Sequence, residues 1–256
     1  MVFKGFILLF SSIYFTAAFA QDDYVLESDN SKTTEINKAI FNKPNPDYTS
    51  YFTTPTAYTL TKRDFRLASN DILFFKASYG LTNNTTISLN ISAFSSLVGS
   101  IKQNIKRNEN VSVSITASIG DLTSGLEDTT VLFTGGSGQA TIGDHQNNVT
   151  IGTGIYYINS SVEMINEESE FFFHTINAGF QKQLSKNIYL MIDGLYFTNY
   201  NILTGGAGFK FVIKTKYSIN AGLMPIFWNN IRSTRYDFTS GVIPFFSARM
   251  LIERKD

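Results

Sequence analysis

The chain has 256 residues, with 21 Lys and Arg against 21 Asp and Glu, so its formal net charge is +0. This balance provides no basic stripe for a nucleic acid. The absence of Cys excludes a disulfide framework, a Cys-ligated metal and a lipid-anchored N-terminus. Charged residues make up only 16% of the chain and aromatic residues 14%, a balance that suits a β-barrel with aromatic girdles at two membrane interfaces.

The first twenty residues have the organisation of a secretory signal peptide. Lys4 precedes a short apolar run, Phe6 to Phe15, and Ala18-Phe19-Ala20 forms an Ala-x-Ala cleavage site before Gln21. The run is shorter than the roughly 20 residues that a transmembrane helix needs. We therefore expect residues 1–20 to be removed and the protein to reach the outer membrane of a Gram-negative cell.

Residues 21–50 form a polar lead-in without strand periodicity. They are rich in Asn, Asp, Ser and Lys and contain Pro44 and Pro46. We expect a periplasmic tail or linker here, followed by a single β domain over residues 51–256. Whether this tail plugs the domain stays open at this point.

Period-two alternation is the strongest pattern in the chain. In Thr85–Phe94 (TTISLNISAF) apolar residues alternate with small polar ones, and Val111–Ile119 and Val149–Tyr157 repeat the pattern. The polar face carries Ser, Thr, Asn and Gly rather than the charged residues of a soluble sheet. Such strands fit between lipid and a narrow wet lumen.

Strand-like segments follow one another from residue 51 to the end, and together they predict an all-β fold, a transmembrane antiparallel β-barrel. A candidate extra strand at Thr56–Thr61 would bring their number to twelve, and ten would remain if two segments merged or lay outside the barrel. The segments are Phe65–Tyr79, Thr86–Phe94, Leu97–Lys106, Val111–Ile119, Thr130–Ile142, Val149–Ile158, Phe171–Gln183, Ile188–Thr198, Leu203–Lys214, Tyr217–Phe227 and Val242–Glu253.

The connections alternate between short turns and mostly longer polar loops. The short ones include Gly80–Asn84, Arg107–Asn110, Gly143–Asn148, Leu184–Asn187 and Lys214–Lys216. The longer ones are Gly120–Asp128, Asn159–Glu170 and Asn229–Gly241. Outer-membrane barrels show this asymmetry, with the short turns in the periplasm.

Three blocks of the sequence resemble a group of outer-membrane β-barrel proteins of Bacteroidetes-type (flavobacterial) bacteria. The blocks are PTAYTL (Pro55–Leu60), DILFFKASYGLTNNTTISLNIS (Asp71–Ser92) and TIGDHQNNVTIGTGIYY (Thr141–Tyr157). The resemblance spans Tyr51 to about Ile252. It implies a barrel of no settled activity and carries over no functional residue.

Charged residues on the polar face are the candidates for a lumen site. Asp193 interrupts the apolar run IYLMIDGLYF, and a charge is cheaper inside the barrel than against lipid. We expect an ion pair between Asp193 and Lys210 of the next strand, and the alternative role is a selectivity charge in a pore. The lumen and pore candidates are Asp193, Lys210, Lys76, Lys102 and Arg249, and the same parity adds Arg66, Lys106 and Glu253, whereas Lys182 shares the face of His174.

Chemistry beyond transport has little support in the sequence. His174 lies on the lipid-facing parity, where a lipid-modifying enzyme would also need a nucleophile and an orienting group beside it. The glycine clusters Gly135–Gly138 and Gly205–Gly208 lack the following Lys-Ser/Thr of a phosphate loop and indicate bends, bulges or close approach. We expect no catalytic residue, metal or cofactor.

The best functional hypothesis is a passive small-solute pore or a structural barrel, with outer-membrane lipid and small solutes as partners. The alternatives are an adhesion or interaction barrel that binds an extracellular partner through its longer loops, a lipid-modifying enzyme using His174, and a soluble secreted β protein.

Overall fold

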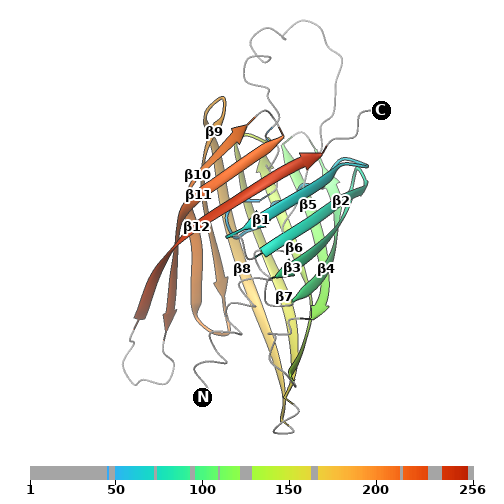
Figure 1. Cartoon of the computed structure of the whole chain (residues 1–256), viewed down its shortest axis with the longest axis vertical. Helices are drawn as coiled ribbons and strands as arrows, with labels where there is room; N and C mark the ends of the chain where they lie inside the picture. Colours follow the sequence, from blue (N-terminus) through green and yellow to red (C-terminus); the bar gives the residue numbers. More distant parts are fainter. Residues whose placement is uncertain are drawn as a thin grey trace, which may run out of the picture.

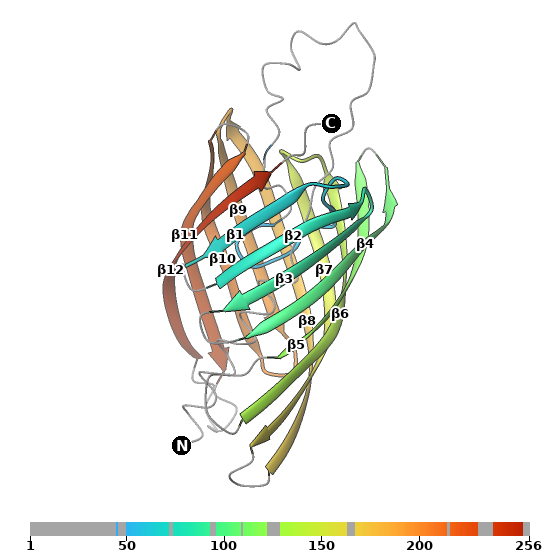
Figure 2. The ribbon, with the colours of Figure 1, turned by 45° about the vertical axis from the view of Figure 1, so that its right-hand side comes forward.

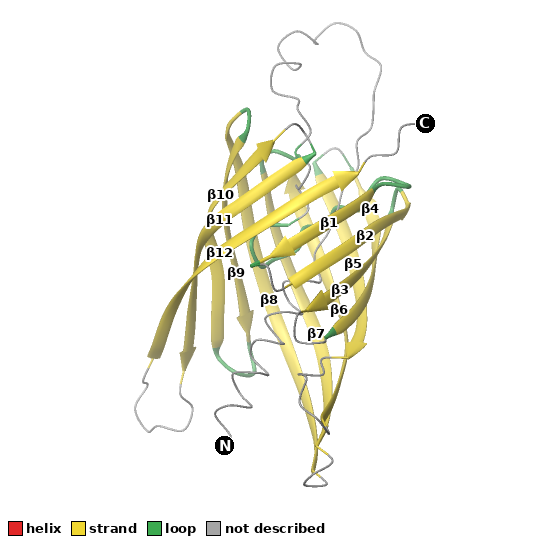
Figure 3. Ribbon diagram, viewed as in Figure 1, coloured by secondary structure: helices red, strands yellow, loops and turns green. Residues whose placement is uncertain are grey.

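The computed structural model describes residues 45, 50–71, 74–92, 96–108, 110–121, 129–162, 167–213, 216–229 and 238–252. The expected signal peptide and most of the expected polar lead-in lie outside these ranges. Twelve strands form one closed antiparallel barrel (Figures 1 and 3). They are β1 (Phe65–Asn70), β2 (Phe74–Thr82), β3 (Thr85–Ser92), β4 (Leu97–Arg107), β5 (Val111–Asp121), β6 (Thr129–Gly143), β7 (Asn148–Val162), β8 (Glu167–Ser185), β9 (Ile188–Phe197), β10 (Ile202–Ile213), β11 (Tyr217–Asn229) and β12 (Phe238–Ile252).

Each strand pairs with its neighbours in sequence, and β1 closes the barrel against β12. The closing register runs from Phe65 opposite Ile252 to Asn70 opposite Ser247. Closure satisfies the backbone groups along this seam, as a sheet within lipid requires. Among the described residues, no helix is long and apolar enough to cross a membrane.

The outer surface of the barrel is apolar on every strand. Along β5, Ile115 is 52% exposed while its neighbour Thr116 is 6% exposed and faces inward. The same alternation exposes Ile87, Leu89, Ile91, Ile101, Ile119, Leu132, Ile151, Ile155, Phe172, Ile176, Ile192, Leu203, Phe209, Ile219, Leu223 and Phe246. The predicted barrel, with apolar residues outside, is therefore confirmed. The alternative of a soluble β protein needed these apolar faces to point inward, and they point outward.

The number twelve is confirmed, but two strand assignments are wrong. Phe65–Tyr79 is two strands, because the chain turns at Asp71, which has a positive φ of 48°. Asp tolerates this conformation better than most residues. The amide of Asp71 donates to the Phe246 carbonyl (2.7 Å), and its carboxylate accepts from the Phe246 amide (2.8 Å). Thr56–Thr61, the candidate extra strand, lies outside the twelve strands.

The two ends of the barrel differ. The turns after β2, β4, β6, β8 and β10 lie at the same end as the start of β1 and the end of β12, and we call this the short-turn end (Figure 1). The opposite end is the long-loop end. There β7 and β8 extend through most of the expected loop Asn159–Glu170, with Asn159 opposite Glu170 and Val162 opposite Glu167. This hairpin projects beyond β1 to β4 (Figure 2).

Replacement of Ile115 by Arg tests the outward face. Ile115 lies midway along β5, where an Arg facing hydrocarbon costs about 2–4 kcal/mol. We expect Ile115→Arg to lower the free energy of unfolding by that amount in urea titrations in lipid bilayers. Ile115→Leu is the matched control and stays near wild type. Equal stability of the two variants would contradict a lipid-facing Ile115.

Candidate functional site

A stretch of chain that precedes β1 lies inside the barrel. We call residues Ser50–Leu60 the inner segment, and every one of them is buried. Tyr51, Ala57 and Leu60 are 0% exposed, and Phe52 is 1% exposed. The lumen is therefore occupied, and the candidate functional site consists of this segment together with the wall residues that hold it.

Wall side chains hydrogen-bond to the backbone of the inner segment. The amide of Ala57 donates to Thr141 Oγ1 (2.7 Å), and the amide of Leu60 donates to Thr86 Oγ1 (2.8 Å). The carbonyl of Thr56 accepts from Lys102 Nζ (3.0 Å). Asn104 Nδ2 donates to the carbonyl of Ala57 (3.0 Å). Irregular buried backbone needs such partners, and polar side chains of the inner face supply them.

Asp193 is the strongest single attachment of the inner segment. Its Oδ2 atom accepts from the Thr53 amide (2.5 Å), the Thr53 hydroxyl (2.9 Å) and the Thr54 amide (2.7 Å). Hydrogen bonds to an ionised acceptor are about twice as strong as neutral ones. This carboxylate therefore fixes the turn at Thr53 and Thr54 against β9.

The expected ion pair between Asp193 and Lys210 is wrong. Asp193 lies opposite Gly206 in the β9–β10 register, and Lys210 lies opposite Tyr189, four residues further along β10. At about 3.3 Å per residue this separates the two positions by roughly 13 Å along the strand. Lys210 Nζ instead donates to Gln181 Oε1 (2.8 Å) and to the carbonyl of Ser50 (3.4 Å).

The start of the inner segment contacts a second cation, Arg249 of β12. Its guanidinium donates to Ser50 Oγ and to the carbonyl of Tyr51 (3.3 Å). With Lys102 and Lys210, three cationic side chains from three parts of the wall thus bind the inner segment.

Two aromatic side chains of the inner segment press against glycines of the wall. A Cβ atom at Gly179 would lie 2.2 Å from the Tyr51 ring, and Cβ atoms at Gly206 and Gly222 would lie 2.7–2.8 Å from Phe52. The Tyr51 hydroxyl donates to Asn148 Oδ1 (2.6 Å). The glycines of Gly205–Gly208 therefore allow a close approach from inside the barrel, and the sequence alone could not name the partner.

The inner face of the barrel is apolar toward the long-loop end, whereas the sequence pattern predicted a polar inner face along the whole strand. Neighbouring rings pack in sequence across the wall: Phe133 with Tyr156 (5.5 Å between centroids), Tyr156 with Phe173 (5.1 Å), and Phe173 with Phe197 (5.9 Å). The full apolar layer contains Val98, Val131, Phe133, Tyr156, Ile158, Phe173, Leu195, Phe197 and Ile202. These residues have inward parity, so alternation located the face correctly but not its polarity.

Most of the charged residues assigned to the inner face are buried there. Lys210 is 0% exposed, and the others are Arg66, Lys76, Lys102, Asp193 and Arg249. Lys106 is exposed, because a bulge between Asn104 and Lys106 shifts the register of β4. Lys182 is exposed on the outer face, and Glu253 lies outside the described residues.

The two histidines have different surroundings. His174 faces outward, and its Nε2 atom lies 2.6 Å from Thr153 Oγ1 while its Nδ1 atom lies 3.3 Å from Thr198 Oγ1. His145, in the turn after β6, packs edge-on against the Tyr58 ring (4.8 Å). Burial, reinforced by the Arg107 cation, lowers the pKa of His145 to about 3. Its imidazole is therefore neutral at pH 7 where it contacts the inner segment.

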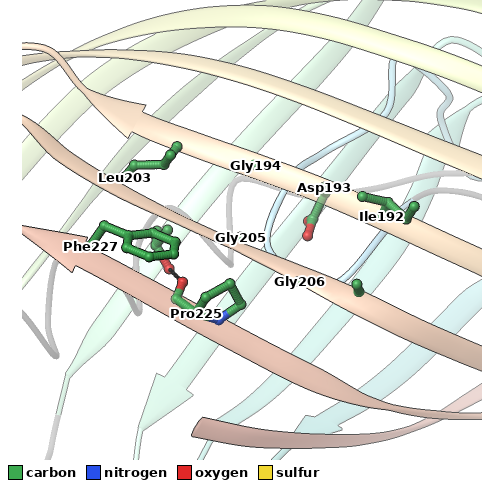
Figure 4. A pocket seen from close by; sticks show the side chains of 10 residues that line it. Ile192, Asp193, Gly194, Leu203, Gly205, Gly206, Pro225 and Phe227 are labelled. Atoms are coloured by element: carbon green, nitrogen blue, oxygen red, sulfur yellow. Dashed lines mark hydrogen bonds between the residues drawn. The ribbon is translucent and has the colours of Figure 1, made fainter. Parts of the chain in front are cut away.

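A cavity of about 220 Å³ opens in the wall beside Asp193 (Figure 4). It lies where the β10–β11 register skips Gly205 and Gly206, next to Pro225. Proline has no amide hydrogen to donate, so the ladder is interrupted there. Among the described atoms, Asp193 Oδ1 is buried without a hydrogen-bond partner. No group of three or more His, Cys, Asp or Glu among the described residues could hold a metal ion.

A closed barrel of twelve antiparallel strands with an apolar outer belt is an integral outer-membrane β-barrel.

No known protein family and no curated protein matches the sequence. Solved structures with a similar fold include the NanC porin (TM-score 0.44, 8% identity, covering 73% of this chain and 98% of that one). The KdgM porin has a TM-score of 0.41 at 12% identity and covers 73% and 96% of the two chains. Omp33 of Acinetobacter baumannii has a TM-score of 0.37 at 8% identity, with 74% and 97% covered. These likenesses concern the fold alone.

Substitution of Gly179 tests the contact between wall and inner segment. Gly179→Ala places a methyl group against the Tyr51 ring, and overpacking of this kind costs about 1–3 kcal/mol. The chain has no Cys, so Ala57→Cys reports the exposure of the inner segment to a water-soluble maleimide. We expect Gly179→Ala to accelerate labelling about tenfold, because 1.4 kcal/mol corresponds to a factor of ten.

Gly138→Ala is the matched control, since the nearest atom to its Cβ position, the Ser114 oxygen, is 4.0 Å away. Equal labelling rates in the two glycine variants would show that Tyr51 does not lie against Gly179.

Proposed function

We propose that the protein is an outer-membrane pore for small solutes and that the inner segment closes it in the state described here. One observation carries the proposal: the backbone of the inner segment is attached to the barrel through side chains of the wall. It belongs to none of the twelve strands, and its isolated bridge, Ser50 with Pro55, is internal. Its departure therefore breaks no strand ladder.

The composition of the lumen supports a pore over a purely structural barrel. Buried polar and ionic groups add little net stability compared with well-packed apolar residues, so a barrel needing only to persist has no use for them. The wall nevertheless presents Thr86, Lys102, Thr141, Asp193 and Lys210 to the inner segment. Each of these groups can be hydrated when the segment leaves, which is the condition for a water-filled passage.

Several further features belong to the same proposal. Residues 1–20 are a cleaved signal peptide, and the polar lead-in that begins at residue 21 is periplasmic. The chain is a member of the flavobacterial group that its hairpins resemble, and those hairpins correspond to β2–β3 and β6–β7. Transport proceeds without catalysis, and bilayer lipid and small solutes are the partners.

Weakening the attachment at Asp193 should open the pore. Asp193→Ala removes the acceptor of three hydrogen bonds, and a hydrogen bond to a charged group contributes about 1.5–3 kcal/mol. In single-channel recordings from planar bilayers we expect the open fraction to rise at least about tenfold.

Thr53→Val provides a graded comparison, because it removes the hydroxyl donor and keeps both amides. Its open fraction should lie between those of wild type and Asp193→Ala. If Asp193→Ala folds, as shown by heat-modifiable gel migration, and conducts no more than wild type, the inner segment is not a removable closure.

A further inference from the structure

The cavity in the barrel wall lies across three adjacent strands, β9, β10 and β11 (Figure 4). Part of its lining belongs to the lipid-facing surface, because the side chains of Ile192, Leu203 and Phe227 are exposed there. Gly194 lies directly opposite Gly205 among these residues, so the outer surface has no side chain at this pair. A molecule dissolved in the bilayer therefore reaches the cavity from the membrane side.

The lining is apolar apart from two polar side chains, Asp193 and Thr204. Thr204 Oγ1 donates to the carbonyl of Pro225 (3.3 Å), beside the interruption of the β10–β11 ladder. Asp193 Oδ2 accepts from the inner segment, whereas Asp193 Oδ1 is buried and has no hydrogen-bond partner among the described atoms. Figure 4 shows the Asp193 side chain directed from β9 toward Gly205 and Gly206. One carboxylate oxygen thus holds the inner segment, and the other is left for a donor in the cavity.

These two features define the chemistry of an occupant. A buried carboxylate oxygen without a donor is costly, because it has lost its water and gained no hydrogen bond in return. A hydroxyl group supplies a short, charge-assisted hydrogen bond to such an oxygen. The rest of the lining suits a hydrocarbon chain. An ammonium group is a poor candidate, since it would have to cross hydrocarbon to reach the cavity. A neutral alcohol meets both requirements.

We propose that the wall cavity binds neutral aliphatic alcohols from the membrane. The hydroxyl donates to Asp193 Oδ1, and the hydrocarbon chain lies along Gly194 and Gly205 between Ile192 and Leu203. The inference goes beyond the pore function and holds whether or not the inner segment moves. An acyl chain of a bilayer lipid fits the same apolar lining but brings no donor to Asp193. An affinity that depends on the donor therefore distinguishes the two occupants.

Two isomeric probes isolate the contribution of the hydroxyl. The alcohol n-hexanol has a donor, and methyl pentyl ether contains the same atoms without one. Binding to the protein in detergent micelles is followed by the amide chemical shifts of Gly205 and Gly206 in proton–nitrogen NMR spectra. We expect saturable shifts with n-hexanol. At equal concentration in the micelle phase the ether should bind at least about tenfold more weakly, because it forms no hydrogen bond to the charged acceptor.

Gly194→Val fills the cavity and leaves the bonds of Asp193 in place. A Cβ atom at Gly194 would lie 3.8 Å from its nearest neighbour, the Thr204 carbonyl oxygen, so the backbone need not shift. We expect this variant to bind n-hexanol at least about tenfold more weakly than wild type. Gly99→Val on β4 is the matched control, since its Cβ position is also 3.8 Å from a carbonyl oxygen, that of Ile119. It should bind n-hexanol as wild type does.

Folding of each variant is verified by heat-modifiable gel migration. If Gly194→Val does not fold, Ala207→Val takes its place, because Ala207 is an exposed residue of the same lining. Equal affinities for n-hexanol and the ether would assign the cavity to an acyl chain and overturn the alcohol site. Absence of saturable shifts, or binding that filling the cavity does not weaken, overturns it as well. None of these readouts depends on conductance, so a protein that never conducts can retain the alcohol site and lose the pore.

Discussion

The structure depends on the need of buried, irregular backbone for hydrogen-bond partners. The inner segment runs through the barrel outside the twelve strands, so the wall must supply donors for its carbonyls and acceptors for its amides. Asp193, Thr86, Thr141 and Lys102 do so, each from a different strand. The polar composition of the inner face around the segment and the placement of the Asp193 carboxylate beside the Thr53 and Thr54 amides follow from that requirement, while the glycines under Tyr51 and Phe52 make room for the two rings.

The lumen is divided by chemistry along its length. Toward the long-loop end the wall is apolar and aromatic, and farther in it is polar and cationic around the inner segment. A solute entering from the long-loop end would meet aromatic rings before it meets charge. The aromatic layer packs on the wall itself, whereas the inner segment is attached by individual hydrogen bonds and belongs to none of the twelve strands.

Sequence periodicity was sufficient for the fold because lipid enforces it. Every second residue of a strand faces lipid and must be apolar, as Ile87, Ile115 and Ile155 are. The break at Asp71 was missed because apolar residues continue on both sides of a tight turn. The extension of β7 and β8 was missed because strands beyond the bilayer have water on both faces and lose their alternation.

The candidate site was less accessible to sequence reasoning. Alternation along the strands placed Asp193, Lys210, Lys76, Lys102 and Arg249 inside the barrel. It does not give the register between neighbouring strands. The predicted ion pair of Asp193 with Lys210 was wrong for that reason. No sequence signal indicated the role of Thr53 and Thr54. The adjoining stretch Thr56–Thr61 (TAYTLT) alternates as a strand does, so it did not reveal that the segment lies inside the barrel. The cluster Gly205–Gly208 indicated bends, bulges or close approach, and only the structure shows that Phe52 lies against Gly206 and that Tyr51 lies against Gly179.

The most direct measurement of the central claim is an NMR experiment on the protein in detergent micelles. The Phe52 ring lies against the paired residues Gly208 and Gly222 on the inner face of β10 and β11. Nuclear Overhauser effects between the Phe52 ring protons and the α-protons of both glycines are expected, together with those between the Tyr51 ring and Gly179. Intact cross-strand effects along β10–β11 without any effect to Phe52 or Tyr51 would show an empty lumen and contradict the account.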